Sequence, residues 1–211
     1  MLLAYCITEA HFEPLPMKGV GGMALEHFTE GGLRCFVSHH EALSGDNVQR
    51  SALEFHHALS AILVSTALIP FRFPTLLAGL DELTAHIREN YEDYEAGLQR
   101  LRHALQMEAR ITLADTAPET ETSTSGRTYL EGRRNRLQSL ESISAALRHA
   151  VAPWLLDWKQ KETSRGLRCY ALVDRDSLAH FREAAAEITV EASVRLHLSG
   201  PWPASEFLRQ E

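Results

Sequence analysis

Two pairs of adjacent histidines are the residues of this sequence best suited to bind a metal. They are His39–His40 and His56–His57, in a chain of 211 residues with eleven histidines. Adjacent side chains point to opposite faces of a strand, and around a helix they diverge by about 100°. Neither pair has the i, i+4 spacing of a helical zinc site, and no HExxH motif is present. We therefore expect no metal site and no cofactor.

Two further segments contain residue types found in catalytic or phosphate-binding sites. Ser38 and His39 are followed by Asp46, but the sequence has no GxSxG motif. The glycine-rich run from Gly19 to Gly22 lacks the Lys-Ser/Thr that completes a phosphate-binding loop. We find no arrangement of residues suited to acid–base or nucleophilic catalysis. The sequence therefore predicts a protein that is not an enzyme.

The composition is that of an ordinary globular protein with one large domain or two small ones. The chain is 45% hydrophobic and 23% charged. Its formal net charge of −7 argues against a nucleic-acid partner, because phosphate binding needs a basic surface. The apolar runs are too short to span a bilayer, so we expect a cytoplasmic protein with no membrane partner. Three cysteines without a CxxC motif are predicted to be buried and reduced: Cys6, Cys35 and Cys169.

The first 76 residues predict an α+β domain. Short apolar runs indicate three strands, over 2–8, 33–38 and 68–73, and Pro70 confines the third to a sheet edge or a bulge. The paired glycines Gly31 and Gly32 indicate a turn before the second strand. Apolar residues at steps of three and four predict a helix over 48–66, with Val48 among the residues of its apolar face and Leu53 at the edge of that face.

The middle of the chain predicts two long helices. The first has a heptad-like seam: Leu80, Leu83, Ile87, Tyr91, Tyr94, Leu98, Leu101 and Leu105. A seam this narrow favours a partner helix over a broad core. The second begins after residue 126, ends near Val151, and is followed by a short helix over 154–161. Between the two, the segment 114–125 is rich in Thr, Ser and Glu and predicts a mobile loop. The two helices would form an antiparallel hairpin over about 77–161.

The last third predicts a strand, a helix and a second strand. Their expected bounds are 167–173, from Asp176 or Ser177 to about 188, and 190–198. This order suggests half of a ferredoxin-like sandwich over about 167–203. We therefore predict an α+β fold in which ferredoxin-like α/β sandwich portions flank a long antiparallel, coiled-coil-like helical hairpin. The second domain would cover residues 77–211.

Four segments, in this order, resemble the gas vesicle protein F/L family (GvpL/GvpF). They are IPFRFPT at 69–75, GRTYL at 126–130, YALVDR at 170–175, and VRLHLSGPWP at 194–203, which is followed by Phe207. The Gly-Pro-Trp-Pro string is the most specific of them. The chain departs from the family pattern at Pro74, where Gly is usual, and at Ala204 to Glu206, where a Pro-Pro-Tyr-Ser-like stretch is usual.

The resemblance implies a non-enzymatic role in building gas vesicles, in the cytoplasm or on the vesicle. Family members are proposed to contact the main shell protein and to nucleate or order the shell. The implied partners are this shell protein and other gas vesicle accessory proteins, with self-association left open. The departures motivate an alternative, an interaction or scaffold module without a gas vesicle role. For Trp202 two roles stay open, packing against the sheet and anchoring a partner. The predicted partner-binding residues are Pro70, Phe71, Arg72, Phe73, Tyr129, Gly200, Pro201, Trp202, Pro203 and Phe207.

Overall fold

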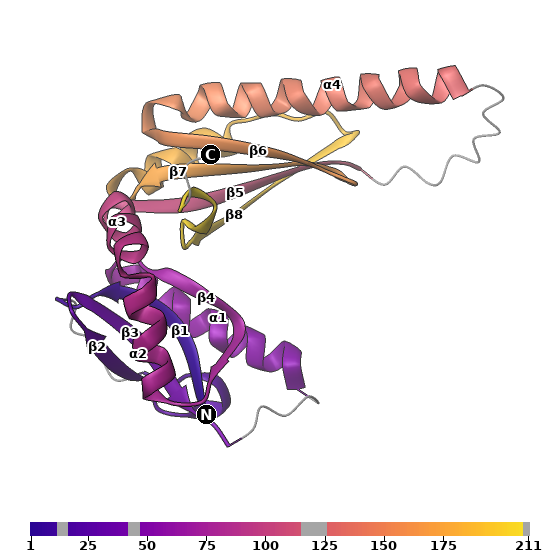
Figure 1. The fold of residues 1–211 in the computed structure, drawn as a ribbon. Coiled ribbons are helices and arrows are strands. Elements are labelled where there is room, and N and C mark those ends of the chain that lie inside the picture. The colour runs from indigo at the N-terminus through magenta and orange to yellow at the C-terminus, as the bar shows by residue number, and fades with distance from the viewer. Residues whose placement is uncertain (12–16, 42–46, 115–125, 209–211) are drawn as a thin grey trace. The chain divides into compact units, whose positions relative to one another are not determined.

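The chain folds into two compact units (Figure 1). The computed structural model describes residues 1–11, 17–41, 47–114 and 126–208, and over 126–137 only the course of the backbone. Unit 1 comprises Met1–His103 and Trp202–Glu211, and unit 2 comprises Ala104–Pro201. Unit 1 is therefore interrupted by unit 2. This division differs from the predicted domain boundary near residue 76.

Unit 1 is built on a four-stranded antiparallel sheet with the strand order β2-β3-β1-β4. The strands are β1 (Leu2–Glu9), β2 (Glu26–Glu30), β3 (Leu33–His39) and β4 (Ile69–Leu77). Strand β1 is buried from Leu2 to Thr8 because helices cover both faces of the sheet. Such a strand reads as a continuous apolar run, which is why the sequence predicted it.

The two faces of this sheet are covered by different helices. Helix α1 (Val48–Ser65) packs on one face, where Phe55 stacks on Tyr5. Helices α2 (Leu80–Glu89) and α3 (Tyr91–Leu101) pack on the other. Between β2 and β3, Gly31 has a φ of +59° and a Cβ there would lie 2.8 Å from the Tyr91 ring. Only glycine fits this turn, which confirms the turn predicted from the paired glycines.

The predicted helical hairpin is wrong. Helices α2 and α3 are separated at Asn90, whose side-chain amide donates to the His86 carbonyl over 2.8 Å. Leu83, Ile87 and Leu98 of the apolar seam are buried, but they pack on the sheet, whereas Leu80 is 48% exposed. Hydrophobic spacing shows which side of a helix is buried but does not show whether a helix or a sheet buries it.

Unit 2 is built on a second four-stranded antiparallel sheet, with the order β6-β7-β5-β8. Its strands are β5 (Ala104–Leu113), β6 (Leu155–Thr163), β7 (Gly166–Asp174) and β8 (Val194–Trp202). Helices α4 (Gly126–Val151) and α5 (Leu178–Ala186) share one core with it. Four short 3₁₀ turns complete the described elements: η1 (Val20–Gly22), η3 (Ala152–Trp154), η4 (Arg175–Ser177) and η5 (Ser205–Phe207).

The second half of the predicted hairpin is also wrong. In the described part of α4, Leu140, Leu147 and Val151 are buried in the core that the helix shares with the sheet of unit 2, so no coiled coil is seen there. The helix predicted over 154–161 is strand β6, paired with β7. Two sheets with their own helices therefore replace the predicted ferredoxin-like portions around a coiled coil. The predicted mobile loop lies, apart from Ala114, outside the described residues. Among the described helices none is long and apolar enough to cross a membrane.

Candidate interaction surface

The Tyr5 hydroxyl holds the glycine-rich loop against the sheet of unit 1. It accepts a hydrogen bond from the Val20 N–H over 2.7 Å and lies 2.9 Å from Ser38 Oγ. Burial raises the pKa of Tyr5, so the hydroxyl stays neutral. A Cβ at Gly19 would lie 2.2 Å from this oxygen, so glycine is required there by the close approach of the backbone. The run from Gly19 to Gly22 therefore has a packing role.

The same loop is tied to helix α1. The Gly21 N–H donates to Glu54 Oε2 over 2.8 Å, and Arg50 Nε donates to Oε1 of the same carboxylate over 2.9 Å. The hydrogen bond from Gly21 and then the one from Arg50 lower the pKa of Glu54. A carboxylate of the chain itself thus occupies the backbone N–H that a phosphate-binding loop would offer to its ligand.

The IPFRFPT segment forms a bulge in strand β4, the edge strand of its sheet. Ala4 pairs with Thr75 and Cys6 pairs with Pro70, so residues 71–74 stand opposite the single residue Tyr5. A bulge of this kind interrupts the row of backbone groups that an edge strand would otherwise present. The sequence predicted an edge strand or a bulge here, and both are confirmed.

The bulge sends its two phenylalanines to opposite faces of the sheet. The Phe73 ring lies 5.1 Å from the Phe55 ring of α1, which in turn stacks at 4.8 Å on Tyr5. The Phe71 ring lies 5.6 Å from the His86 ring of α2. Between the two phenylalanines, the Arg72 side chain is exposed to solvent. The segment therefore packs both helical layers of unit 1 onto its edge strand.

The Gly-Pro-Trp-Pro segment brings the chain back to unit 1. The ring of Trp202 lies 4.9 Å from that of His56, the residue after Phe55 on α1. Burial, and then the neighbouring His57, lower the pKa of His56, so its imidazole is neutral at pH 7. Trp202 is only partly buried, whereas Phe207 is 1% exposed.

Helix α1 turns an apolar stripe outward next to this tryptophan. Leu53 is 59% exposed and Val64 is 77% exposed, with the exposed His57 between them. Residues spaced by four and seven lie on one side of a helix. We call these three residues, together with Trp202, the α1 surface. Sequence reasoning missed it and expected Val48, which is also exposed, and Leu53 on or beside the buried face.

The remaining predicted residues lie at three places. Pro70 is on β4 and Pro203 follows Trp202, and both are half-buried. Gly200 and Pro201 end the part of β8 that belongs to unit 2, where Arg182 Nη2 donates to the Gly200 carbonyl over 2.8 Å. The Tyr129 side chain lies outside the described residues. The structure therefore brings Phe73 and Trp202 together around α1, but it does not gather all ten residues into one site.

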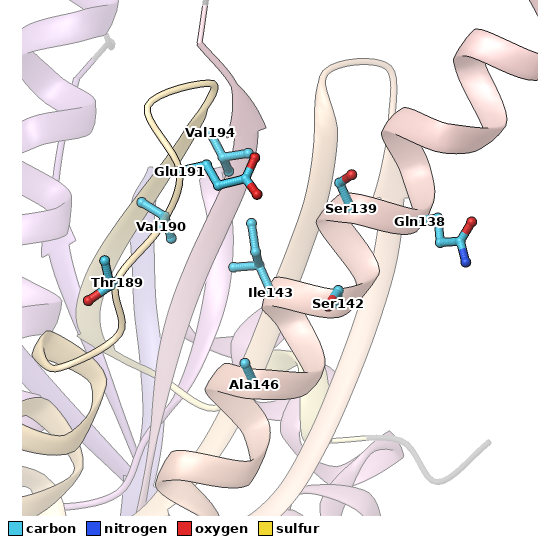
Figure 2. Close-up of a pocket in the computed structure, with 9 residues that line it drawn as sticks. All are labelled: Gln138, Ser139, Ser142, Ile143, Ala146, Thr189, Val190, Glu191 and Val194. Atoms are coloured by element: carbon cyan, nitrogen blue, oxygen red, sulfur yellow. The ribbon is translucent and has the colours of Figure 1, made fainter.

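Unit 2 contains a pocket of about 630 Å³ between α4 and the segment that joins α5 to β8 (Figure 2). Ile143, Val190 and Val194 supply apolar side chains, and Ser139 and Ser142 on α4 supply hydroxyls. Glu191 is the ionisable residue among those that line it. In the part of the chain that the structure describes, no three His, Cys, Asp or Glu side chains are grouped to hold a metal. The pocket therefore offers binding space without an evident catalytic group.

The family model described as "Gas vesicle synthesis protein GvpL/GvpF" matches residues 1–209. The chain belongs to this family. Its fold is similar to the crystal structure of the gas vesicle protein GvpF from Anabaena sp. PCC7120, with a TM-score of 0.82 at 13% identity over 100% of this chain and 96% of that one. GvpF from Microcystis aeruginosa gives a TM-score of 0.79 at 13% identity, over 99% of each chain. No curated protein matches the sequence.

Family membership indicates a role related to gas vesicles. At 13% identity the two crystal structures establish the shared fold alone. Their coverage of nearly the whole chain shows that both units belong to that common fold. The functional residues must therefore be argued from the surface of this chain.

Proposed function

We propose that this protein is a non-enzymatic gas vesicle assembly or minor structural protein. It contacts the main shell subunit and helps to nucleate or order the shell. The support is its membership of the GvpL/GvpF family over residues 1–209. It acts in the cytoplasm or on the vesicle, together with other gas vesicle accessory proteins.

The α1 surface is the part of unit 1 that we assign to the shell contact. Its outward Leu53 and Val64 would lose water contact on binding a hydrophobic shell subunit, which gives a favourable free energy in proportion to the apolar area covered. A partly buried tryptophan beside such a stripe is the kind of residue that dominates binding energies. The exposed apolar stripe next to Trp202 is the observation that carries this assignment.

Two other predicted residues lie beside this surface. Phe73 packs against Phe55 under α1. Arg72 is exposed at the tip of the β4 bulge and is available for a polar contact at the rim. In this arrangement the two family motifs position α1, and α1 makes the contact.

Co-purification of the tagged protein with the shell subunit tests the proposal. Leu53→Glu and Val64→Glu change exposed side chains, so they should leave folding intact, as circular dichroism would show. Trp202→Ala should weaken capture by roughly 30-fold, which corresponds to about 2 kcal/mol for a central aromatic residue. Both glutamate variants should reduce capture as well, because they place a charge in an apolar contact.

Leu156→Glu is the matched control, since Leu156 is 57% exposed but lies on β6 in unit 2. It should capture the shell subunit as well as the unchanged protein does. If Leu53→Glu, Val64→Glu and Trp202→Ala capture the shell subunit as well as Leu156→Glu does, α1 is not the contact surface. No capture by the unchanged protein would count against the shell-binding function itself.

A further inference from the structure

A line of hydrogen bonds joins the glycine-rich loop to the end of strand β3. The Val20 N–H donates to the Tyr5 hydroxyl over 2.7 Å, and this hydroxyl lies 2.9 Å from Ser38 Oγ. Ser38 Oγ in turn lies 2.8 Å from His40 Nε2. We call these four groups the Tyr5 network: the Val20 N–H, the Tyr5 hydroxyl, the Ser38 hydroxyl and the His40 imidazole. Histidine is the member of the network that titrates near neutral pH.

The contact between Ser38 and His40 has the distance of a nucleophile and its base, but it is not a catalytic pair. Ser38 is 0% exposed, so a substrate does not reach its hydroxyl. Tyr5 is also 0% exposed and Val20 is 2% exposed, whereas the His40 ring is only half-buried. His40 is therefore the group through which the pH of the solution acts on the network.

The number of hydrogens in the network decides the protonation state of His40. Two contacts need one hydrogen each, Tyr5–Ser38 and Ser38–His40, and among the described residues the two hydroxyls have no other partner that could accept one. Buried hydroxyl hydrogens need acceptors, and the Val20 N–H beside Tyr5 is a donor. The hydrogens therefore point from Tyr5 to Ser38 and from Ser38 to His40 Nε2. An imidazole that accepts at Nε2 is neutral and carries its hydrogen on Nδ1.

Protonation of His40 adds one hydrogen more than the network can accept. An imidazolium donates at Nε2, so three hydrogens then meet two contacts. If Ser38 turns its hydroxyl toward Tyr5, the Tyr5 hydrogen is left beside the Val20 N–H, which is itself a donor. If the imidazolium ring turns into water instead, Ser38 loses its acceptor. In each case one buried donor is unpaired, which is unfavourable.

The charged groups around His40 also oppose its protonation. Burial, then the Met1 amine and then His39 lower the pKa of His40. The amine lies at the start of β1 and donates to the His40 carbonyl over 3.0 Å. His39 precedes His40 in the chain, and its Nε2 is 3.6 Å from Glu26 of β2. On the side of α1, Glu54 acts on the phenol at the other end of the network. Among the described residues, no carboxylate forms an ion pair with His40.

In the described part of unit 1, two side chains hold the glycine-rich loop to the rest of the unit by hydrogen bonds. One is Tyr5, which accepts from Val20, and the other is Glu54 of α1, which accepts from Gly21 over 2.8 Å. The other backbone hydrogen bonds of the loop, over residues 17–25, lie within it. A weaker contact at Tyr5 therefore leaves Gly21, which is exposed, as the remaining hydrogen-bonded attachment.

We propose that protonation of His40 loosens the glycine-rich loop from the sheet of unit 1. The loop is held in place at neutral pH and opens in mildly acidic solution. In the open state His40 has left the network and has the ordinary histidine pKa of about 6.5, so that state binds the proton more readily than the closed state does. The closed loop is therefore fully stabilised above pH of about 6.5, and this stabilisation is lost as the pH falls from there to the lowered pKa.

An open loop changes the surroundings of helix α1. Gly21 donates to Glu54, which follows Leu53 of the α1 surface in the chain. Release of the loop would therefore alter the edge of that surface. The inference itself does not depend on the proposed shell contact, because it concerns hydrogen bonds within unit 1 and is tested on the protein alone.

Titration of the histidines by NMR on the full chain tests the first step. The Cε1–H resonance of His40, assigned with His40→Gln, should titrate below the ordinary histidine value of about 6.5. Ser38→Ala removes the hydroxyl that donates to Nε2, so the pKa of His40 should move back toward that value. Tyr5→Phe is the matched control, because it removes a buried hydroxyl that does not touch His40, and it should leave the pKa of His40 low.

Hydrogen exchange of the Val20 N–H tests the second step. After correction for the intrinsic rate, its protection should fall roughly tenfold between about pH 7 and pH 5, and more than that of the β1 amides. His40→Gln should abolish this loss, because the glutamine carbonyl accepts from Ser38 at both pH values and does not titrate. His56→Gln is the matched control, since His56 is a second half-buried histidine of unit 1 with a lowered pKa, and it should keep the loss.

Several results would overturn the proposal. One is a pKa of His40 at or above its ordinary value in the unchanged protein, which needs no variant to measure. Equal protection of the Val20 N–H at the two pH values is another. The proposal also fails if His40→Gln loses this protection in acid as the unchanged protein does. If His56→Gln removes the loss, the acid-sensitive group lies on α1 and the Tyr5 network is not responsible.

Discussion

Removal of the Tyr5 hydroxyl should destabilise unit 1 by about 1–3 kcal/mol, the cost of leaving one buried donor without an acceptor. In Tyr5→Phe the Val20 N–H loses its bond to this oxygen, and Val20 is 2% exposed, so water cannot replace it. Ser38 Oγ loses the same neighbour but keeps His40 Nε2 at 2.8 Å. Tyr5→Phe therefore leaves one buried donor, the Val20 N–H, without an acceptor.

Gly19→Ala provides a second measurement of the same contact. The added Cβ would lie 2.2 Å from the Tyr5 hydroxyl and 2.8 Å from the ring carbon that carries it. Gly19→Ala should therefore cost less in the Tyr5→Phe background than in the unchanged protein, because the closer of the two clashes is gone. The ring carbon remains, so the relief should be partial. The two changes should be non-additive, as expected for residues in direct contact.

Urea unfolding followed by tryptophan fluorescence measures both effects. Trp154→Phe and Trp158→Phe remove the tryptophans of unit 2 and leave Trp202 as the reporter of unit 1. The midpoint should fall while the slope with urea stays constant, since the exposed area on unfolding is unchanged. A loss below about 0.5 kcal/mol for Tyr5→Phe, within the range of ordinary surface changes, would refute the reasoning. Additive effects of the two changes would refute it as well.

Three further predictions concern both units. Burial raises the pKa of Glu108, but hydrogen bonds from two arginines outweigh this and hold it below its ordinary value. The ionised Glu108 carboxylate therefore stabilises the folded state above pH of about 4.3, and this stabilisation is lost as the pH falls through the folded pKa. In urea unfolding, Glu108→Gln should lose less stability at acid pH than the unchanged protein does. Phe207→Ala should cost unit 1 about 3–5 kcal/mol, measured by Trp202 fluorescence. Burial raises the pKa of every thiol, so a disulfide reagent should react with these cysteines only on unfolding: Cys6, Cys35 and Cys169.

Local sequence patterns predicted the elements that have one kind of environment along most of their length. Strand β1 is apolar from Leu2 to Ile7 because both of its faces are buried there, and Pro70 correctly indicated an edge strand with a bulge. Strand β6 was missed because LLDWKQKET contains good helix formers, and its strand conformation depends on pairing with β7. Long-range pairing of this kind leaves no local signal, so the pattern alone favoured a helix.

The candidate surface was only partly predictable for a related reason. Helix α1 is apolar on several sides, and the sequence could not show that Ala58 would be buried while Val64 stays 77% exposed. The IPFRFPT segment was identified, but the division of Phe71 and Phe73 between two faces follows from the register of β4 with β1. The family resemblance identified this segment, but only the pairing of β4 with β1 showed on which face of the sheet each phenylalanine lies.

Because unit 2 is inserted within unit 1, the folding of unit 2 lowers the cost of docking the C-terminal segment on unit 1. Trp202 and Phe207 can dock on unit 1 only if the chain closes a loop of roughly one hundred residues, at an entropic cost that grows with (3/2)RT ln n. Strands β5 and β8 are antiparallel neighbours, so a folded unit 2 brings its two ends together. The effective loop then shrinks to a few residues, which lowers the closure cost by about 3 kcal/mol. Unit 2 thus acts as an internal crosslink whose own folding retains the tryptophan on α1.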